Sequence, residues 1–446
     1  MRRFSVKKIY ARFSDSTVTF FDHAKMTENI FMIIVAIIIG VLAGFGAIAI
    51  RALIKELSIL SYGGGEHFLA HVLAAPWYLR LLIPIIGGLI VGPIIYFIAP
   101  EAKGHGVPEV MESILLKGGV IRARVAIVKA IVSAISIGTG GSVGREGPIV
   151  QIGSSLGSSV GKFFGISNKR LKTLVGCGAA AGIAAAFNAP IAGALFAVEI
   201  ILMDFAVAQF SPIVISSVMA TVISHTFQGD FAAFLVPKYT LTSPYEIIFY
   251  FALGAISGLV SYLFIKVLYT SEDFFDNHFH IPPYLKPAVG GVGLGLIAIF
   301  FPQVMGVGYD SINEALHGNM IWYIAFILVF AKILATSITL GSGGSGGIFA
   351  PSLFMGAMLG YFFGQFVHYF FPAITSTPGA YALVAMGGLI AGTTRAPITA
   401  IVIVFELTSD YRIILPVMIT SIISTILSSK LSRESIYTLK LLLRNI

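Results

Sequence analysis

One acidic residue stands out in a chain that is otherwise poor in charge. Glu146 lies in GREGP (144–148), a short segment that also contains two glycines and a proline. Its carboxylate can carry a negative charge or a proton, and an apolar environment disfavours the charged form. The phrase around it, GTGGSVGREGPIVQIGSSLG (138–157), recurs as GSGGSGGIFAPSLFMGAMLG (341–360) with nine identities in twenty positions. The repeated phrase is therefore where ionisable chemistry and unusual backbone coincide.

Both phrases are glycine runs that end at a proline, which is typical of a helix start. A helix N-terminus presents unpaired N–H groups and a partial positive charge, so it binds anions. In the second copy Ile348 and Phe349 replace Arg145 and Glu146, so this start offers only backbone donors. Two such starts, one from each copy, would converge on one anion. The alternative is that both phrases form close helix crossings of the small-xxx-small kind.

The elements that carry these phrases must lie in a membrane. The chain of 446 residues is 57% hydrophobic and 11% charged, whereas soluble domains carry about 25% charged residues. Apolar runs recur, several of them interrupted by Gly or Pro, at 31–50, 81–99, 321–334 and 413–427. Interrupted backbone at membrane depth must face protein or water. We therefore expect one all-α polytopic domain over 29–430, with roughly ten or more spans or part-spans of about 20 residues.

The repeat extends beyond the two phrases. GHG (104–106) recurs 202 residues later as GVG, and the segment 184–199 recurs 207 residues later with matching Ala, Pro, Ile and Glu. Three blocks in one order at nearly one offset indicate a duplication, with halves at roughly 29–230 and 240–430. Duplicated membrane halves are typical of transporters, where they often run in opposite directions with the substrate site between them.

Basic residues are dispersed and flank the apolar runs. The polar segment 1–28 lacks the pattern of a secretory signal, and both it and the segment 431–446 carry several Lys and Arg. The positive-inside rule places both termini in the cytoplasm, at a plasma or inner membrane. The net charge of +8 fits this topology, and nucleic-acid binding is a poor alternative. Cys177 is the single cysteine, so no disulfide framework or cysteine metal site is expected.

Four motifs resemble those of the CLC chloride channels and chloride/proton exchangers: GHGVPE (104–109), GREGP (144–148), GGIFAP (346–351) and SIYTLK (435–440). The resemblance covers nearly the whole chain. It implies an inverted repeat of tilted and broken helices in the lipid bilayer, a homodimer with a pore in each subunit, chloride or another small anion as substrate, and no cofactor. It also implies that Glu146 is the gate and competes with the anion. The anion-binding residues that it implies are His105, Gly106, Gly144, Arg145, Gly147, Gly347, Ile348, Phe349 and Tyr437. Many members continue into cytoplasmic CBS domains, which are not expected within this chain.

Two positions depart from the family pattern. His105 stands where a serine commonly contacts the anion, so the preference among chloride, nitrate and fluoride stays open. Its imidazole can donate one N–H, can make transport pH-sensitive by protonation, or can swing away and leave the contact to the backbone. Ile200 stands where proton-coupled members carry an acid, although Glu199 or Asp204 could substitute. Glu199 is also the repeat equivalent of Glu406, which favours a shared structural role. We therefore favour passive, channel-like conduction, with chloride/proton antiport as the alternative.

Other chemistries fit the sequence less well. GSGGSG (341–346) matches the dinucleotide pattern GxGxxG, but no acid follows at about 20 residues. GGSG (343–346) would suit an intramembrane serine protease with Ser345 as nucleophile and His368 as base, an interpretation that explains neither the repeat nor Glu146. A cation transporter would need acids along its path, and acids are scarce. The other histidines are scattered, so no metal site is expected.

Overall fold

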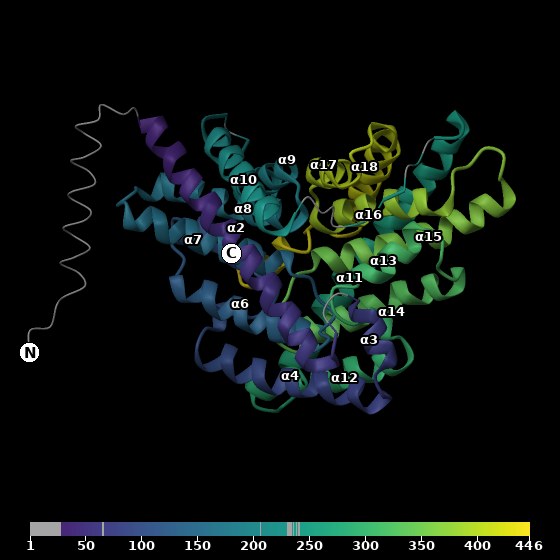
Figure 1. Ribbon diagram of the computed structural model, residues 1–446, viewed down its shortest axis with the longest axis horizontal. Coiled ribbons are helices and arrows are strands. Elements are labelled where there is room, and N and C mark those ends of the chain that lie inside the picture. Colours follow the sequence, from purple (N-terminus) through teal and green to yellow (C-terminus); the bar gives the residue numbers. More distant parts are fainter. Residues whose placement is uncertain are drawn as a thin grey trace, which may run out of the picture.

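The computed structural model describes residues 28–446 except 65–66, 206, 230–233, 235, 238 and 240. The predicted cytoplasmic segment 1–28 thus lies outside the described residues except for Glu28. The regular elements in the described ranges are all helical, and two isolated β-bridges join loops. Figure 1 shows the helices gathered in one body, with the C-terminal end within its outline. The predicted all-α polytopic fold is confirmed.

Two series of helices follow each other along the chain. The first comprises α2 (Glu28–Tyr62), α3 (Phe68–Ala74), α4 (Trp77–Phe97), η1 (Pro100–Ala102), α5 (Val107–Leu116), α6 (Ala123–Gly138), α7 (Glu146–Phe163), α8 (Asn168–Phe187), α9 (Pro190–Phe196), the π-helical turn η2 (Ala197–Leu202) and α10 (Val207–Gln228). The second comprises η3 (Pro244–Glu246), α11 (Ile247–Asn277), η4 (Pro283–Leu285), α12 (Lys286–Phe300), η5 (Pro302–Val304), α13 (Tyr309–Leu316), α14 (Trp322–Gly341), α15 (Phe349–Phe370), α16 (Pro378–Thr394), α17 (Pro397–Thr408), η6 (Tyr411–Ile413) and α18 (Ile414–Leu431). A final helix, α19 (Thr438–Leu443), follows them. Apart from α3, the α-helices of the two series correspond in order, from α2 and α11 to α10 and α18.

Nine helices in the described part of the chain are long and apolar enough to cross a membrane. The four predicted apolar runs fall in α2, α4, α14 and α18. In contrast, α9 has 7 residues and α17 has 12, so neither can span a bilayer alone. Each begins with a proline in its first turn, where no N–H partner is lost. Broken helices are thus present, but outside the interrupted runs: the run 81–99 falls in α4, which continues through Pro84 and Pro93.

The later glycines of the two repeated phrases form close helix crossings. A Cβ on Gly153 in α7 would lie 2.1 Å from the carbonyl oxygen of Gly178 in α8. A Cβ on the equivalent Gly356 in α15 would lie 2.6 Å from the carbonyl oxygen of Ala385 in α16. Larger side chains would force both helix pairs apart. The close-crossing alternative therefore holds for the second part of each phrase, whereas the first part forms the site described below.

Reciprocal contacts relate the two halves by an approximate two-fold rotation. The carboxylate of Glu199 accepts two backbone N–H groups at the start of α17, at 3.2 and 2.7 Å. The carboxylate of Glu406 accepts the two equivalent N–H groups at the start of α9, at 2.9 and 2.7 Å. Each carboxylate thus stabilises the positive end of a short helix in the other half. Contacts that are the same in both directions are the mark of a two-fold relation.

The same relation appears between α4 and α12, which lie side by side at the lower edge of Figure 1. A small cavity of about 30 Å³ lies among α4, α6, α12 and α14. The pairs that line it are Pro84 and Pro287, Gly87 and Gly290, Ser136 and Thr339, and Thr139 and Ser342, each 203 residues apart. Because equivalent residues face one space, the approximate axis passes through it.

Two buried lysines clamp the loops that lead into α5 and α13. Lys129 in α6 and Lys332 in α14 are repeat equivalents, and neither is exposed. Their acceptors, at 2.7–3.0 Å, are the backbone carbonyl oxygens of Ala102 and Gly104 for Lys129 and of Val304 and Gly306 for Lys332. A buried ammonium group needs such partners. The clamps therefore fix two loops that carry site residues.

Candidate functional site

The glycine-rich starts of α7 and α15 touch each other. The N–H of Gly144 donates to the carbonyl oxygen of Gly347 at 2.7 Å, and the N–H of Gly347 donates back at 2.6 Å. At Gly147, a Cβ would lie 2.9 Å from Gly347 Cα and 2.3 Å from the carbonyl oxygen of His105. Because side chains at these positions would separate the loops, the glycines bring two helix N-termini to one place. The two predicted helix starts therefore meet.

The start of α5 is a third member of this junction. The N–H of Gly104 donates to the carbonyl oxygen of Gly344 at 3.0 Å, and the N–H of Gly346 donates to Gly104 at 3.3 Å. Gly106 has a φ of 86°, which favours glycine, and directs the chain into α5. Its Cβ position is 3.2 Å from the carbonyl oxygen of Gly147. The starts of α5, α7 and α15 thus carry the predicted anion-binding residues other than Tyr437.

Glu146 is fully buried at this junction. Its Oε1 accepts a hydrogen bond from the hydroxyl of Tyr309 at 2.6 Å and lies 4.0 Å from Nε of Arg145. Its Oε2 has no hydrogen-bond partner among the described residues and lies 2.3 Å from the Cβ position of Gly144. The side chain therefore folds back over its own helix start. The tyrosine contact is much closer than the ion pair with Arg145.

His105 and Tyr437 lie against each other on the next part of the site. Their ring centroids are 5.8 Å apart, and both side chains are buried. Nε2 of His105 lies 3.5 Å from the hydroxyl of Tyr269, which donates its proton to the carbonyl oxygen of Ile436. Nδ1 of His105 has no hydrogen-bond partner among the described residues. The imidazole thus remains at the site with one ring nitrogen unpaired.

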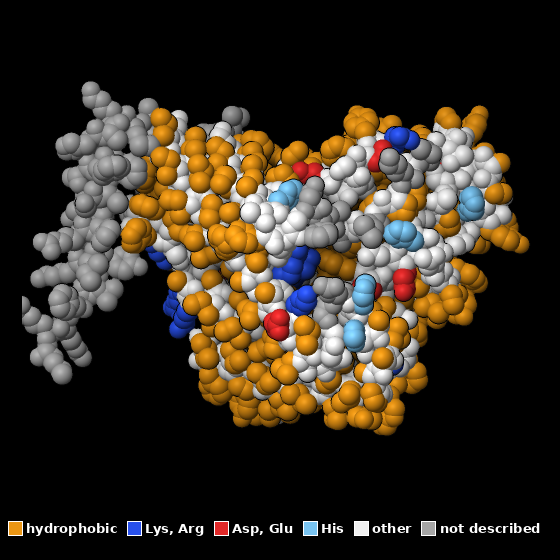
Figure 2. Space-filling model, in the orientation of Figure 1, with side chains coloured by type: hydrophobic (Ala, Val, Ile, Leu, Met, Phe, Trp, Pro, Cys, Tyr) orange, Lys and Arg blue, Asp and Glu red, His pale blue; other side chains and the backbone are white. Residues whose placement is uncertain are grey.

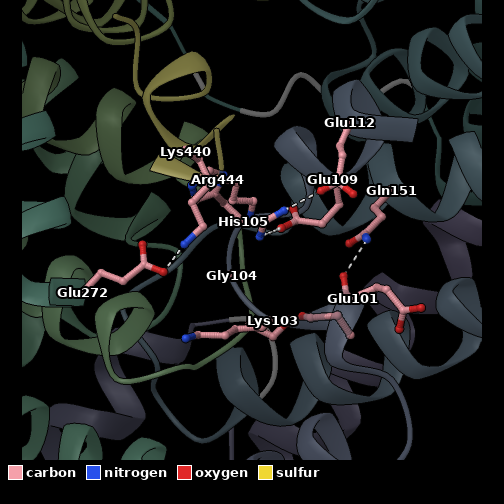
Figure 3. A network of polar contacts seen from close by, with 12 residues as sticks. Glu101, Lys103, Gly104, His105, Glu109, Glu112, Gln151, Glu272, Lys440 and Arg444 are labelled. Carbon is pink, nitrogen blue, oxygen red and sulfur yellow. Dashed lines mark hydrogen bonds and ion pairs between the residues drawn. The ribbon is translucent and has the colours of Figure 1, made fainter. Parts of the chain in front are cut away.

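Ion pairs hold the C-terminal helix α19, and with it Tyr437, against the rest of the molecule. Figure 3 shows these pairs beside His105. Lys440 donates to Glu272 of α11. Arg444 bridges Glu109 and Glu112 of α5, with both distances at 2.8 Å. The segment 431–446 is therefore docked on the helices that frame the site.

A positively charged cavity of about 290 Å³ lies beside Glu146, lined by its neighbours. Tyr309 and Arg145 line it together with Arg51 and Lys55. The acid Asp310 also lines it, but its carboxylate accepts a backbone N–H at 2.9 Å. Figure 2 shows hydrophobic side chains over most of this face and basic side chains near its middle, where α2 crosses it. Such a cavity attracts anions toward Glu146.

The position that the family resemblance assigns to a proton route carries no acid. Ile200 lies buried in the π-helical turn η2. Its neighbour Glu199 has both carboxylate oxygens engaged at the start of α17, and Oε2 also accepts the hydroxyl of Thr399 at 2.6 Å. Glu199 and Glu406 therefore share the structural role that their repeat equivalence predicted.

The serine protease interpretation requires Ser345 and His368 to lie together, and the structure contradicts this. Ser345 Oγ lies 2.9 Å from the hydroxyl of Ser133 and donates to the carbonyl oxygen of Ala102 at 3.0 Å. His368 lies near the opposite end of α15, where Nδ1 contacts the hydroxyl of Thr375 at 3.0 Å. The nucleophile and its base are thus not brought together.

Three residues at or beside the site stand in no motif of the sequence: Tyr309, Tyr269 and Lys332. Tyr309 directly follows the GVG block, so the repeat marked its loop but not its hydroxyl. Lys332 stands in the apolar run 321–334 at 203 residues from Lys129, and that spacing could have identified both clamps. Tyr269 lies in α11 with no local signal.

Comparison with known proteins agrees with this architecture. Residues 87–429 match the family model described as voltage gated chloride channel. A ClcB-like chloride channel protein of Ralstonia nicotianae is 34% identical, over 91% of this chain and 95% of its own. An H⁺/Cl⁻ exchange transporter ClcA of Vibrio parahaemolyticus is 32% identical, over 91% of this chain and 88% of its own.

The fold is also that of solved structures. A slow cyanobacterial Cl⁻/H⁺ antiporter superposes with a TM-score of 0.83 at 24% identity, over 94% of this chain and 98% of that one. At this identity the likeness concerns the fold. The family model covers well over half of the chain, and the relatives match it along almost their whole length. The chain therefore belongs to the voltage-gated chloride channel family, the CLC family of membrane anion transport proteins.

Proposed function

We propose that this protein carries chloride across the membrane through a pathway that Glu146 gates. The observation that carries the proposal is the position of its carboxylate, buried where the starts of α7 and α15 meet, with one oxygen unpaired. This is where helix N-termini favour a negative charge. An anion that displaces the carboxylate gains the same environment, and the released carboxyl group can then take a proton.

The anion would be held by neutral donors. Backbone N–H groups at Ile348 and Phe349 belong to the first turn of α15, where intrahelical partners are absent. The hydroxyl of Tyr437 and an N–H of His105 could complete the set. In the tautomer that carries its proton on Nδ1, His105 offers an otherwise unpaired donor. An imidazole donor in place of a hydroxyl would set a different preference among chloride, nitrate and fluoride.

Two modes of transport remain candidates. Passive conduction is supported by Ile200, which supplies no proton carrier, and by Glu199, whose oxygens are already engaged. Exchange of chloride for protons is supported at least as well, because the Vibrio parahaemolyticus relative, which is 32% identical, bears an exchanger's name. In exchange, protons would have to bypass Ile200 through water.

The deciding experiment uses liposomes with an imposed chloride gradient and simultaneous chloride and pH electrodes. Uphill proton movement that is lost in Glu146→Gln means exchange. Chloride flux without uphill proton movement means passive conduction. The matched control is Glu56→Gln, an exposed acid on α2, which should behave like the parent. Absence of any chloride flux in the parent protein would overturn the proposal.

We also propose a homodimer with both termini in the cytoplasm. The short helices α9 and α17 leave Ile191 and Ile398 exposed at their starts, at 55% and 45%. The backbone N–H groups at these starts are already capped by Glu406 and Glu199, but the apolar side chains are left uncovered, which favours cover by a second copy. Light scattering of the purified protein in detergent should give twice the chain mass of 47.5 kDa. A single-chain mass would contradict the dimer.

A further inference from the structure

The gate carboxylate depends on one tyrosine. Among the described side chains, Tyr309 makes the single hydrogen bond to Glu146, at 2.6 Å. The other carboxylate oxygen has no hydrogen-bond partner, and Nε of Arg145 has none either, although it lies 4.0 Å from Oε1. A buried carboxylate with so few partners is sensitive to each of them. The hydroxyl of Tyr309 therefore has a large influence on where Glu146 rests.

Tyr309 is itself held from several sides. The ring of Phe234 packs edge-on against its ring, with centroids 4.8 Å apart. The guanidinium carbon of Arg145 lies 5.2 Å from the ring centroid. Gly308 directly precedes it with a φ of 89°, and Lys332 clamps two carbonyl oxygens of the same loop. The ring therefore cannot follow Glu146 when the carboxylate moves.

We propose that Tyr309 is a latch on the gate, which holds the ionised Glu146 carboxylate in the pathway, and that Lys332 positions this latch by fixing its loop. The proposal rests on the proposed function of Glu146. It makes gate release a local event: the bond at 2.6 Å breaks while α13 stays in place. Both residues are positioning residues, because they act on the anion only through Glu146.

The latch favours the ionised form of the gate. A hydroxyl bonds a carboxylate more strongly than it bonds a neutral carboxyl group. The other groups near Glu146 are Arg145 beside it, Arg51 from α2 and Tyr437 from the segment before α19. Tyr309→Phe removes the hydroxyl and leaves all of these unchanged. The gate should then open at higher pH and at lower chloride concentration.

The test compares Tyr309→Phe with Tyr250→Phe in liposomes over a pH series. Tyr250 is the matched control, because its hydroxyl donates to the carboxylate of Glu246 at 3.1 Å in the same fold, away from the gate. For Tyr309→Phe we expect the midpoint of the pH–flux curve to rise by about one unit, which corresponds to about a tenfold shift in gate opening. Tyr250→Phe should keep the parent midpoint. An unchanged midpoint in Tyr309→Phe would overturn the latch.

Further variants distinguish a failure of the latch from a failure of the proposed gate function. Parent flux that is insensitive to Glu146→Gln would overturn the gate and the latch together. Flux that depends on Glu146 but not on Tyr309 overturns the latch alone. In a Glu146→Gln background, Tyr309→Phe should have no further effect on the pH profile. Lys332→Met should shift the midpoint in the same direction as Tyr309→Phe, and Lys332→Arg should restore it.

A spectroscopic measurement keeps the proposal testable if Tyr309→Phe does not fold. Acid-minus-base infrared difference spectra of the parent should contain a tyrosine band that accompanies protonation of Glu146. The same band should be absent from Glu146→Gln, which removes the titrating partner. A parent spectrum without such a band would overturn the latch.

Discussion

At the scale of single residues, His105 is the departure from the family pattern with the clearest consequence for anion binding. Its imidazole is buried, and the cationic groups of Lys129, Lys440 and Arg444 lie near it. Burial and these positive charges both disfavour protonation. The structure therefore favours His105 as a neutral donor over a pH sensor.

We predict that His105→Ser changes anion preference and leaves the pH–flux midpoint in place. A changed donor alters a hydrogen bond worth about 1 kcal/mol, so the chloride-to-nitrate flux ratio should change by about fivefold. The measurement is liposome efflux of chloride, nitrate and fluoride over a pH series. A midpoint that moves with an unchanged flux ratio would show that His105 titrates instead.

Glu146 and His105 could be predicted from the sequence, because both stand in motifs whose backbone is constrained by glycine. Tyr309 and Tyr269 could not be predicted in this way. A tyrosine in an apolar chain has no local sign of its hydrogen-bond partner. That partner is fixed only when α13 approaches α7 and when α11 approaches the segment before α19, and these approaches are tertiary.

At the scale of elements, ion pairs help to hold α19 in place. Burial raises the pKa of Glu112, but its bonds to Lys117 and Arg444 outweigh burial and lower it overall from 4.5. Because the pKa of Glu112 is lowered in the folded state, its ion pair with Arg444 stabilises the docking of α19 above pH 4.5. That contribution is lost as the pH falls through the lowered pKa.

We predict that Arg444→Gln loosens α19 and weakens chloride binding several-fold, because Tyr437 belongs to the same segment. The pairs of Arg444 are partly exposed, so the loss of unfolding free energy should be only about 0.5–1 kcal/mol. Isothermal calorimetry with chloride and a thermal melt measure both quantities. Arg433→Gln, at an exposed arginine of the same segment, should match the parent. Equal effects of both variants would argue against a specific clamp.

Glu199 and Glu406 form a matched pair for testing the proton route. We predict that Glu199→Gln and Glu406→Gln each lower stability by a similar amount, about 0.5–1 kcal/mol, since each weakens one carboxylate-capped helix start. Neither should change the ratio of protons to chloride moved in liposomes. Loss of proton movement in Glu199→Gln alone would instead assign Glu199 to the proton route.

The elements were predictable to different degrees. Long apolar runs and the glycine-to-proline phrases indicated α2, α4, α7, α14, α15 and α18. The short α9 was not foreseen, because the carboxylate that caps its start, that of Glu406, comes from the other half. No local signal marks the π-helical turn η2. Local sequence does not encode a cap that is supplied 215 residues away.

At the scale of the whole molecule, the approximate two-fold relation places equivalent lysines around one site and assigns them different tasks. Lys129 clamps the loop of His105, and Lys332 clamps the loop of Tyr309. Sequence predicted the duplication from its offsets. It could not predict this division, because the two clamped loops present different side chains: the first carries His105 and the second leads to Tyr309.

We predict that Lys129→Met and Lys332→Met both destabilise the protein, Lys332→Met more strongly, and that they change transport differently. Lys332→Met leaves the carbonyl oxygens of Val304 and Gly306 without their donor, at a cost of about 1–3 kcal/mol per group. After Lys129→Met the carbonyl oxygens of Ala102 and Gly104 still accept from Ser345 and from the N–H of Gly346, so the melting temperature in detergent should fall less. Lys129→Met should alter chloride affinity through His105 and leave the pH–flux midpoint unchanged. Lys332→Met should move the midpoint through Tyr309. The two variants control for each other, because a general loss of packing would change both readouts in both proteins. Identical transport profiles would show that the halves act alike and that the gate is set by Glu146 alone.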